Sequence, residues 1–338
     1  MDGMYSYVAR RLILLVPVLF GVSLISFSLM HLIPGDPARA MLGEKASLAE
    51  VERLREELGL NDPLYVQYFR YVSRLLHLDL GRSIITHLPV SEELFQRFPA
   101  TLELTAAGIT IAALIGVVTG VVSATHRNTV LDHFARVLAL LGLSMPVFWL
   151  GIMLILVFSY WFGWFPISGR LDIYLAPPPR VTGLYIVDSM LSGNMETLKS
   201  SVKHLVLPAI ALGTSSAAVI SRMTRSSMLE VLGQDYIVAA RSKGLAERVV
   251  IYKHALRNAL IPTITIVGLQ TGALLGGAVL TETVFSWPGM GRRSVEAIYQ
   301  RDFPIVQGFI LFAAFIFVLV NLLVDLVYAY LDPRIRYR

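Results

Sequence analysis

The feature that most limits the fold of this chain is a series of six long apolar stretches. A bilayer's hydrocarbon core takes about 20 residues of α-helix to cross, and each stretch is long enough. Only 16% of the 338 residues are charged, against roughly 25% in an average soluble domain. The sequence therefore predicts an all-α polytopic membrane protein with six transmembrane helices. The predicted spans are residues 12–33, 100–124, 134–162, 203–221, 260–281 and 304–330.

The distribution of positive charge predicts how these spans are oriented, since cytoplasmic loops carry an excess of Lys and Arg. One side receives 13 Lys and Arg residues against 6 acidic ones, and the other receives 14 against 16 in about twice the length. The more basic side holds both termini, which are therefore predicted to be cytoplasmic. The predicted cytoplasmic segments are 1–11, 125–132, 222–259 and 331–338, and the external ones are 34–99, 163–202 and 282–303. The first apolar run is longer than the roughly 7–15 residues of a signal peptide, so it is predicted to stay as a span.

The sequence lacks the residues and motifs that several kinds of chemistry require. The absence of cysteine excludes disulfides and thiolate metal sites. No Gly-x-x-x-x-Gly-Lys-Ser/Thr loop occurs, so the chain is not expected to hydrolyse ATP by that chemistry. The seven histidines are scattered, and no His-Glu-x-x-His or Gly-x-Ser-x-Gly motif occurs, so no metal site or catalytic residue is predicted. A secondary transporter stays open as another class, although it would keep ionisable residues at mid-membrane; this chain has almost none there.

Small residues recur every four positions in two of the predicted spans. They are Gly108, Ala112, Gly116 and Gly120 in the second span, and Gly268, Gly272 and Gly276 in the fifth. This spacing lets helix backbones approach closely in lipid, and tight packing is favoured over pore lining. In the third span, Pro146 is predicted to produce a kink, because proline removes one backbone hydrogen bond.

The two long external segments carry structure of their own. Ser47 and Glu50 form a predicted capping box, and Gly59 ends the helix that follows. A second helix, rich in aromatic and basic residues, is predicted from Asp62-Pro63 and suits the membrane interface or a docking surface. Segment 163–202 contains three consecutive prolines, which stiffen an extended chain.

The cytoplasmic segment 222–259 is the most informative part of the chain. Gly233 is predicted to end one helix, Asp235 to cap the next and Gly244 to terminate it. The helix between them, residues 236–243, is too short to be stable alone in water. It needs a surface to pack on, which is either a partner protein or, for an ordinary basic loop, anionic lipid headgroups.

This segment resembles a known family. The stretches DYIVAARSKG at 235–244 and HALRNALIP at 254–262 are similar to the coupling segment of binding-protein-dependent ABC importer permeases. Val238 stands where the general pattern has Glu, and the interval from Gly244 to Pro262 is longer; both departures are typical of the peptide/nickel/oligopeptide branch. The likeness continues in RMTRSSMLEVLGQDYI at 222–237, LTETVFSWPGMGR at 280–292 and DPRIR at 332–336.

The resemblance implies the ABC type I importer permease fold, with short interfacial and coupling helices, in a bacterial inner membrane. It also implies a second, C-type permease subunit in a heterodimer, two cytoplasmic ATPases that use ATP and Mg, and a periplasmic or lipid-anchored binding protein. Nucleic acid is not an expected partner. Dipeptides are the expected cargo, with oligopeptides, glutathione, haem or nickel complexes as alternatives. The residues implied to couple to the ATPases are Asp235, Tyr236, Ile237, Ala239, Ala240, Arg241, Lys243 and Gly244.

Polar residues in or near the spans are candidates for the translocation path. The candidates are Gln270, Glu282, Trp287, Asn321 and Asp325. Gln270 is suited either to a peptide backbone or to a bridge between helices. Glu103, Glu282 and Asp325 lie near span ends, where structural pairing with water or an arginine is favoured. Trp287 suits either the mouth of the path or simple interfacial anchoring.

Overall fold

The computed structural model describes residues 2–32, 37–42 and 46–331. Within these ranges the secondary structure is helical, apart from one isolated bridge between Arg82 and Pro89. The predicted all-α polytopic architecture is therefore confirmed. The predicted tail 331–338 lies outside the described residues except for Leu331.

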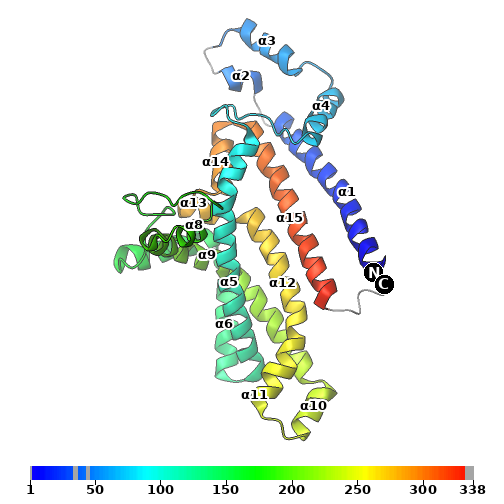
Figure 1. Ribbon diagram of the computed structural model, residues 1–338, viewed down its shortest axis with the longest axis vertical. Helices are drawn as coiled ribbons and strands as arrows, with labels where there is room; N and C mark the ends of the chain where they lie inside the picture. Colours follow the sequence, from blue (N-terminus) through cyan, green and yellow to red (C-terminus); the bar gives the residue numbers. More distant parts are fainter. Residues whose placement is uncertain (1, 33–36, 43–45, 332–338) are drawn as a thin grey trace.

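Five helices are long and apolar enough to cross a membrane, and a bent pair brings the possible number to six. The five are α1 (Asp2–Leu32), α5 (Val90–Thr125), α9 (Met195–Leu232), α12 (Leu256–Gly277) with the short turns before it, and α15 (Phe303–Leu331). Figure 1 shows α1 and α15 together on one flank, with α12 between α15 and the α5–α9 pair. Several of these helices extend beyond the predicted spans, most of all α9.

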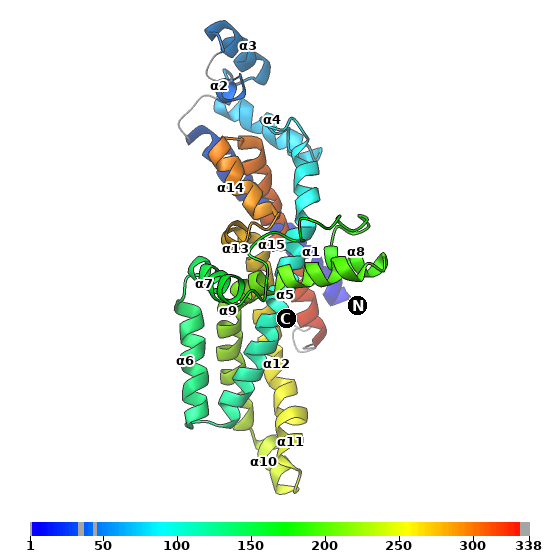
Figure 2. The ribbon, with the colours of Figure 1, turned by 90° about the vertical axis from the view of Figure 1, so that its left-hand side faces the viewer.

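The predicted third span, 134–162, corresponds to a broken pair of helices. It is divided into α6 (Val130–Ser144) and α7 (Val147–Leu154), which runs on as the π-helix η1 (Ile155–Trp161), with a bend of 104° at the break. Pro146 causes the break, since it forces Met145 into an extended backbone conformation (ψ 127°). The predicted bend at Pro146 is thus confirmed, but its angle is far larger than that of a kink. Figure 2 shows α7 lying across the axis of α6.

The closest helix packing lies between α5 and α9, which run parallel. A Cβ atom added at Gly120 would lie 2.6 Å from the Cβ of Thr224, and one at Gly116 would lie 2.7 Å from the Cβ of Ile220. Because real Cβ contacts are longer than this, the seam admits only glycine at both positions. The close packing predicted from the four-residue repeat is confirmed here.

Three short helices follow α1 at the top of the molecule in Figure 1: α2 (Pro37–Leu42), α3 (Leu48–Leu58) and α4 (Leu64–Leu76). The predicted capping box is present, because Ser47 Oγ accepts from the N–H of Glu50 and the Glu50 carboxylate accepts from the N–H of Ser47. Gly59 ends α3 in the left-handed conformation (φ 67°). Helix α4 packs on α1 through aromatic contacts, with the rings of Tyr68 and Phe27 5.3 Å apart.

The remaining short elements form two groups. In one, α8 (Tyr185–Leu191) and α13 (Val279–Val284) lie near mid-height in Figure 1, with α14 (Met290–Gln300) above them. The other group consists of α10 (Asp235–Ser242), α11 (Glu247–Val249) and the π-helix η2 (Val250–Ala255), which leads into α12. Figure 1 shows α10 at the far end from α3.

Candidate coupling surface and translocation residues

Helix α10 is anchored to the spans by two side chains. Ile237 is 0% exposed and Ala240 is buried. Both belong to an apolar cluster that is completed by Val121 and Ala124 of α5, Met228 of α9, Val250 and Ala255 of η2 and Ala259 of α12. The small side chain of Ala240 allows the close seating predicted from the sequence. Through this cluster α10, which packs mainly on η2, is connected to the ends of three spans.

The opposite face of α10 is open. The other six predicted coupling residues are exposed: Asp235, Tyr236, Ala239, Arg241, Lys243 and Gly244. Val238, where the general family pattern has Glu, is 54% exposed. Tyr236 is held by a hydrogen bond to its hydroxyl from Asn258 Nδ2 (2.8 Å). The helix therefore presents a fixed surface of mixed apolar and charged side chains.

The turn after α10 is closed by a glycine and an ion pair. Gly244 has a φ of 76°, and a Cβ added there would meet nothing within 4 Å. Its N–H donates to the carbonyl oxygen of Arg241 (2.9 Å). The Arg241 guanidinium in turn donates to Glu247 (2.7 Å), which ties α10 to α11. The shape of the turn thus depends on glycine for its backbone and not for space.

Two details of this segment differ from the sequence prediction. Asp235 is not the N-cap residue; Gln234 occupies that position without a side-chain hydrogen bond. Asp235 is the first residue of the helix, where a carboxylate is favoured by the helix dipole. The helix is 235–242, with Lys243 as its C-cap, instead of 236–243. Gly233 does end α9, as predicted, in an ordinary right-handed conformation (φ −86°).

A buried carboxylate fixes the spans just above this surface. Asp132 of α6 is 0% exposed. It accepts two hydrogen bonds from Arg225 of α9 (3.0 and 3.1 Å) and one from the N–H of Asn128 (3.0 Å). Ser123 of α5 also donates to it. The group joins α5, α6 and α9 at the end of the molecule where α10 sits.

On the outer side, Trp287 and Glu282 lie inside the packed structure. Trp287 is 0% exposed, and its Nε1 donates to the carbonyl oxygen of Ala100 (2.8 Å). This burial makes interfacial anchoring by Trp287 wrong for this structure. Glu282 accepts from Thr101 Oγ1 (2.7 Å) and from the N–H of Arg292 (2.9 Å). The structural role expected for Glu282 is confirmed, although a hydroxyl and a backbone N–H satisfy it instead of an arginine side chain.

Segment 163–202 is clamped to α5 by a buried ion pair. Arg170 donates two hydrogen bonds to one oxygen of Glu103 (3.0 and 2.6 Å), and both side chains are less than 9% exposed. The guanidinium also lies 3.8 Å from the ring centre of Tyr185 and 5.7 Å from that of Trp287. The structural pairing expected for Glu103, with water or an arginine, is confirmed with Arg170 as the partner, and it holds segment 163–202 in place.

A second buried group joins the start of α5 to α14 and α15. Arg293 of α14 donates to Glu93 (2.8 Å) and to Asp302 (3.3 Å), and all three side chains are nearly inaccessible. Asp302 also accepts from Ser83 and from the N–H of Ile84. The sequence contained only a weak signal for this group, a double arginine directly after a glycine-rich turn.

The candidate path residues do not form one site within this chain. Gln270 of α12 donates to Ser216 Oγ of α9 (3.0 Å), so the helix-bridging alternative is the one observed. Asn321 of α15 has a buried Oδ1 without a hydrogen-bond partner in the described residues. The side chain of Asp325 lies outside the described part of the chain. In the same part, no three His, Asp or Glu residues are placed to hold a metal ion.

Together these features define a multi-pass α-helical membrane subunit that exposes a short, rigidly seated helix at one end. The chain belongs to the family of binding-protein-dependent transport system inner membrane components. The family model matches residues 116–337, and the model of the family's N-terminal region matches residues 4–105. It is therefore an inner-membrane, non-catalytic permease subunit of an ABC transporter, as the resemblance implied.

Curated relatives cover the whole chain. The dipeptide transport system permease protein DppB of Alkalihalophilus pseudofirmus is 53% identical over 99% of this chain and 100% of its own length. The di/tripeptide transport system permease protein DppB of Pseudomonas aeruginosa is 48% identical over the same shares. The dipeptide transport system permease protein DppB of Escherichia coli is 47% identical, again over 99% and 100%.

Proposed function

We propose that this chain is one of two membrane-spanning subunits of an ATP-driven importer that carries dipeptides into the cytoplasm. The observation that carries the proposal is the seating of α10. Its buried face belongs to an apolar cluster with residues of α5, α9 and α12, while its exposed face, apart from the Tyr236–Asn258 and Arg241–Glu247 contacts, is open in the described part of the chain. A chain without a phosphate-binding loop needs its energy from elsewhere, and this exposed face is suited to receive it.

The proposed assembly has four kinds of component. A second, C-type permease subunit completes the conduit, one of two ATPases that use ATP and Mg binds the exposed face of α10, and a periplasmic or lipid-anchored binding protein delivers the cargo. In this arrangement both termini and α10 are cytoplasmic, in agreement with the charge distribution. Helices α3, α4 and α8 then lie on the periplasmic side.

The proposed mechanism transmits a movement of α10 to the spans. The apolar cluster around Ile237 leaves α10 little freedom to move independently of α5, α9 and α12. The Asp132–Arg225 pair extends the connection to α6. When nucleotide binding closes the ATPases, α10 is displaced and the spans change from inward-facing to outward-facing. The ATPases need only favour one of two preformed arrangements.

Dipeptides are proposed as cargo because the curated relatives over the full chain carry that name. Oligopeptides, glutathione, haem and nickel complexes are the alternatives within the same branch. The described residues offer little to choose a peptide by, since Gln270 is engaged with Ser216. We propose that the binding protein makes most of the selection.

Crosslinking tests the coupling proposal directly, because the chain contains no cysteine to interfere. Ala239→Cys places a thiol on the exposed face of α10, and Ser192→Cys places one on the exposed turn after α8, away from α10. With a short thiol-reactive crosslinker in membranes of cells that express the whole system, we expect capture of an ATPase by A239C alone. If the transporter is active and A239C captures no ATPase, the proposal is contradicted.

Uptake measurements test the cargo and the energy source. Proteoliposomes of the complete system should accumulate a labelled dipeptide when ATP is inside and binding protein is outside. An ionophore should leave this uptake intact, and removal of ATP should abolish it. The reverse result identifies a secondary transporter. Competition by an excess of oligopeptide, glutathione, haem or a nickel complex, with no competition by dipeptides, assigns the cargo to another substrate of the branch.

A further inference from the structure

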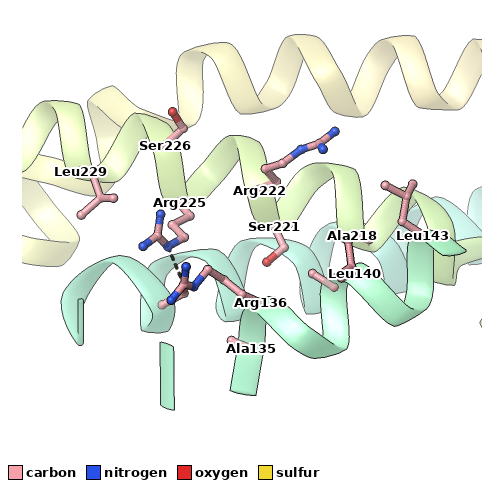
Figure 3. Close-up of a pocket in the computed structure, with 12 residues that line it drawn as sticks. Ala135, Arg136, Leu140, Leu143, Ala218, Ser221, Arg222, Arg225, Ser226 and Leu229 are labelled. Carbon is pink, nitrogen blue, oxygen red and sulfur yellow. Dashed lines mark hydrogen bonds between the residues drawn. The ribbon is translucent and has the colours of Figure 1, made fainter. Parts of the chain in front are cut away.

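A groove of about 520 Å³ lies between α6 and α9, at the end of the molecule that carries α10. Figure 3 shows its two halves. One half holds arginines, with Arg136 of α6 and Arg225 of α9 pointing toward one another. The other half is apolar and is lined by Ala139, Leu140, Leu143 and Ala218. The groove is therefore amphipathic along its length.

The arginine half carries an excess of positive charge. Asp132 is the carboxylate beside it, and it is shared between Arg225 (3.0 Å) and Arg136 (3.4 Å). Arg222 lines the same groove, and no carboxylate lies within ion-pair distance of it among the described residues. Two guanidinium groups, those of Arg136 and Arg225, thus share one carboxylate, while the side chain of Arg222 points away from them in Figure 3. Asp132 is 0% exposed, and its single negative charge is smaller than the positive charge of the arginines that line the groove.

The apolar half opens onto a surface made for hydrocarbon. Helix α6 exposes large apolar side chains along its outer face, among them Phe134, Val137, Leu138 and Leu141. Arg136 lies among them and is 46% exposed. A guanidinium on such a face is costly in hydrocarbon unless it reaches the headgroup region or an anion. Its position therefore marks the level where the headgroups begin.

We propose that this groove binds one anionic phospholipid of the phosphatidylglycerol or cardiolipin class. The phosphate accepts hydrogen bonds from Arg136 and the free edge of Arg225, with Arg222 adding charge at the rim. An acyl chain lies along Ala139, Leu140, Leu143 and Ala218. Basic pockets between membrane helices bind such lipids by this combination of contacts. A free phosphate would use only the arginine half, so the apolar half favours the lipid.

The bound lipid would stabilise the contact between α6 and α9. Apart from close packing, Asp132 is the main polar link between these helices. A phosphate that bridges Arg136 and Arg225 adds a second link on the outer face. The proposal depends only on the chain lying in a membrane, and it stands or falls independently of the cargo and of the ATPase contact.

The test uses the complete transporter purified in detergent, with native mass spectrometry after titration of phosphatidylglycerol or phosphatidylcholine. The wild-type complex should retain phosphatidylglycerol, and its melting temperature should rise with that lipid and not with phosphatidylcholine. Arg136→Gln should lower the affinity for phosphatidylglycerol about tenfold, since hydrogen bonds to charged groups are worth roughly 1.5–3 kcal/mol. Ala139→Phe, which fills the apolar half without changing charge, should lower it as well.

Arg127→Gln is the matched control, because Arg127 lies on an exposed turn at the same end but outside the groove. It should leave the lipid affinity unchanged. Equal retention of phosphatidylglycerol by R136Q, A139F and R127Q would overturn the proposal, as would the same thermal shift with inorganic phosphate alone. A photoreactive residue in place of Leu140 should label lipid; labelling of the second permease subunit would instead make the groove a subunit interface and refute the lipid site.

Discussion

Gly244, in the turn after α10, has a backbone conformation that disfavours any other amino acid. Its φ of 76° lies in the left-handed region, where a side chain costs about 1–2 kcal/mol. Gly244→Ala should therefore distort the turn after α10 without any clash. We expect fewer dipeptides transported per ATP hydrolysed, at nearly unchanged expression and melting temperature, when uptake and ATPase activity are measured on the same proteoliposomes.

Gly193→Ala provides the matched control for this prediction. Gly193 also has a positive φ (69°) with nothing within 4 Å of an added Cβ, but it lies in the turn between α8 and α9. The backbone strain is the same and the location is different. An equal loss of coupling in both variants would show that the effect is general destabilisation and would contradict the role given to α10.

Asp188 makes the stability of the segment around residues 181–184 depend on pH. Burial alone would raise the pKa of this carboxyl, but hydrogen bonds from Thr182, Gly183 and Val181 hold it below its ordinary value of 3.8. A carboxylate with a lowered pKa stabilises the fold above its unfolded-state pKa, and this contribution is lost as the pH falls through the folded-state value. Amide exchange in residues 181–184 should therefore be protected between pH 5 and pH 8, after correction for intrinsic rates, and should become faster only in strong acid.

Asp188→Asn should speed exchange in the same residues at neutral pH about tenfold, since replacing a charged acceptor costs on the order of 1–3 kcal/mol. It should also remove the dependence on acid. Glu196→Gln removes a nearby exposed carboxylate and serves as the control, with no change expected. Protection in D188N equal to that of the wild type would mean that Asp188 does not order this segment.

The ionic contacts show where prediction at the level of residues ends. The capping box at Ser47 was predictable because both partners lie within one helical turn. The pairs Arg170–Glu103 and Arg293–Glu93 join positions 67 and 200 residues apart. No periodicity connects such positions, and their pairing depends on how the helices pack. The same reason explains why Trp287 was not recognised as a core residue.

At the scale of elements, the close contact between α5 and α9 restricts the choice of amino acids most strongly. A Cβ atom at Gly120 would lie 2.7 Å from the carbonyl oxygen of Ser221, a backbone atom that cannot rotate away. Gly120→Ala should force the helices apart and destabilise the protein by about 1–3 kcal/mol, the usual cost of overpacking. We expect a lower melting temperature by tryptophan fluorescence and reduced transport.

Gly276→Ala is the control for the seam. Gly276 belongs to the small-residue repeat of α12, yet a Cβ added there meets nothing within 4 Å. Alanine is favoured over glycine in a helix by roughly 0.5–1 kcal/mol, so this variant should be as stable as the wild type or slightly more so. Equal destabilisation by both changes would argue against close packing as the reason for Gly120.

Sequence patterns predicted the elements unevenly. Apolar length located the long helices, because the requirement for about 20 residues acts on each helix separately. The 104° bend between α6 and α7 was not predictable in size, since Pro146 removes a hydrogen bond but the direction of the chain afterwards is set by packing of α7 on α9 and α13. The π-helices η1 and η2 left no signal either, because they follow from local packing and not from composition.

At the scale of the whole molecule, the two ends are built differently. The outer end is held by buried ion pairs that connect segments far apart in the sequence, around Arg170 and Arg293. The end with α10 is held by apolar packing and by one buried carboxylate, Asp132. The proposed coupling role requires that the apolar cluster around α10 moves together with the spans while the ion-paired end keeps its shape.

The proposed orientation of the molecule, with α10 on the cytoplasmic side, is open to a direct test. The absence of cysteine allows single thiols to be placed at will. Ser242→Cys lies on the exposed end of α10 and Ser192→Cys at the exposed end of α8, and both changes are nearly isosteric. In intact spheroplasts, a membrane-impermeant maleimide should label S192C at once and S242C only after the membrane is permeabilised. Labelling of S242C from outside would invert the topology and place α10 out of reach of any cytoplasmic ATPase.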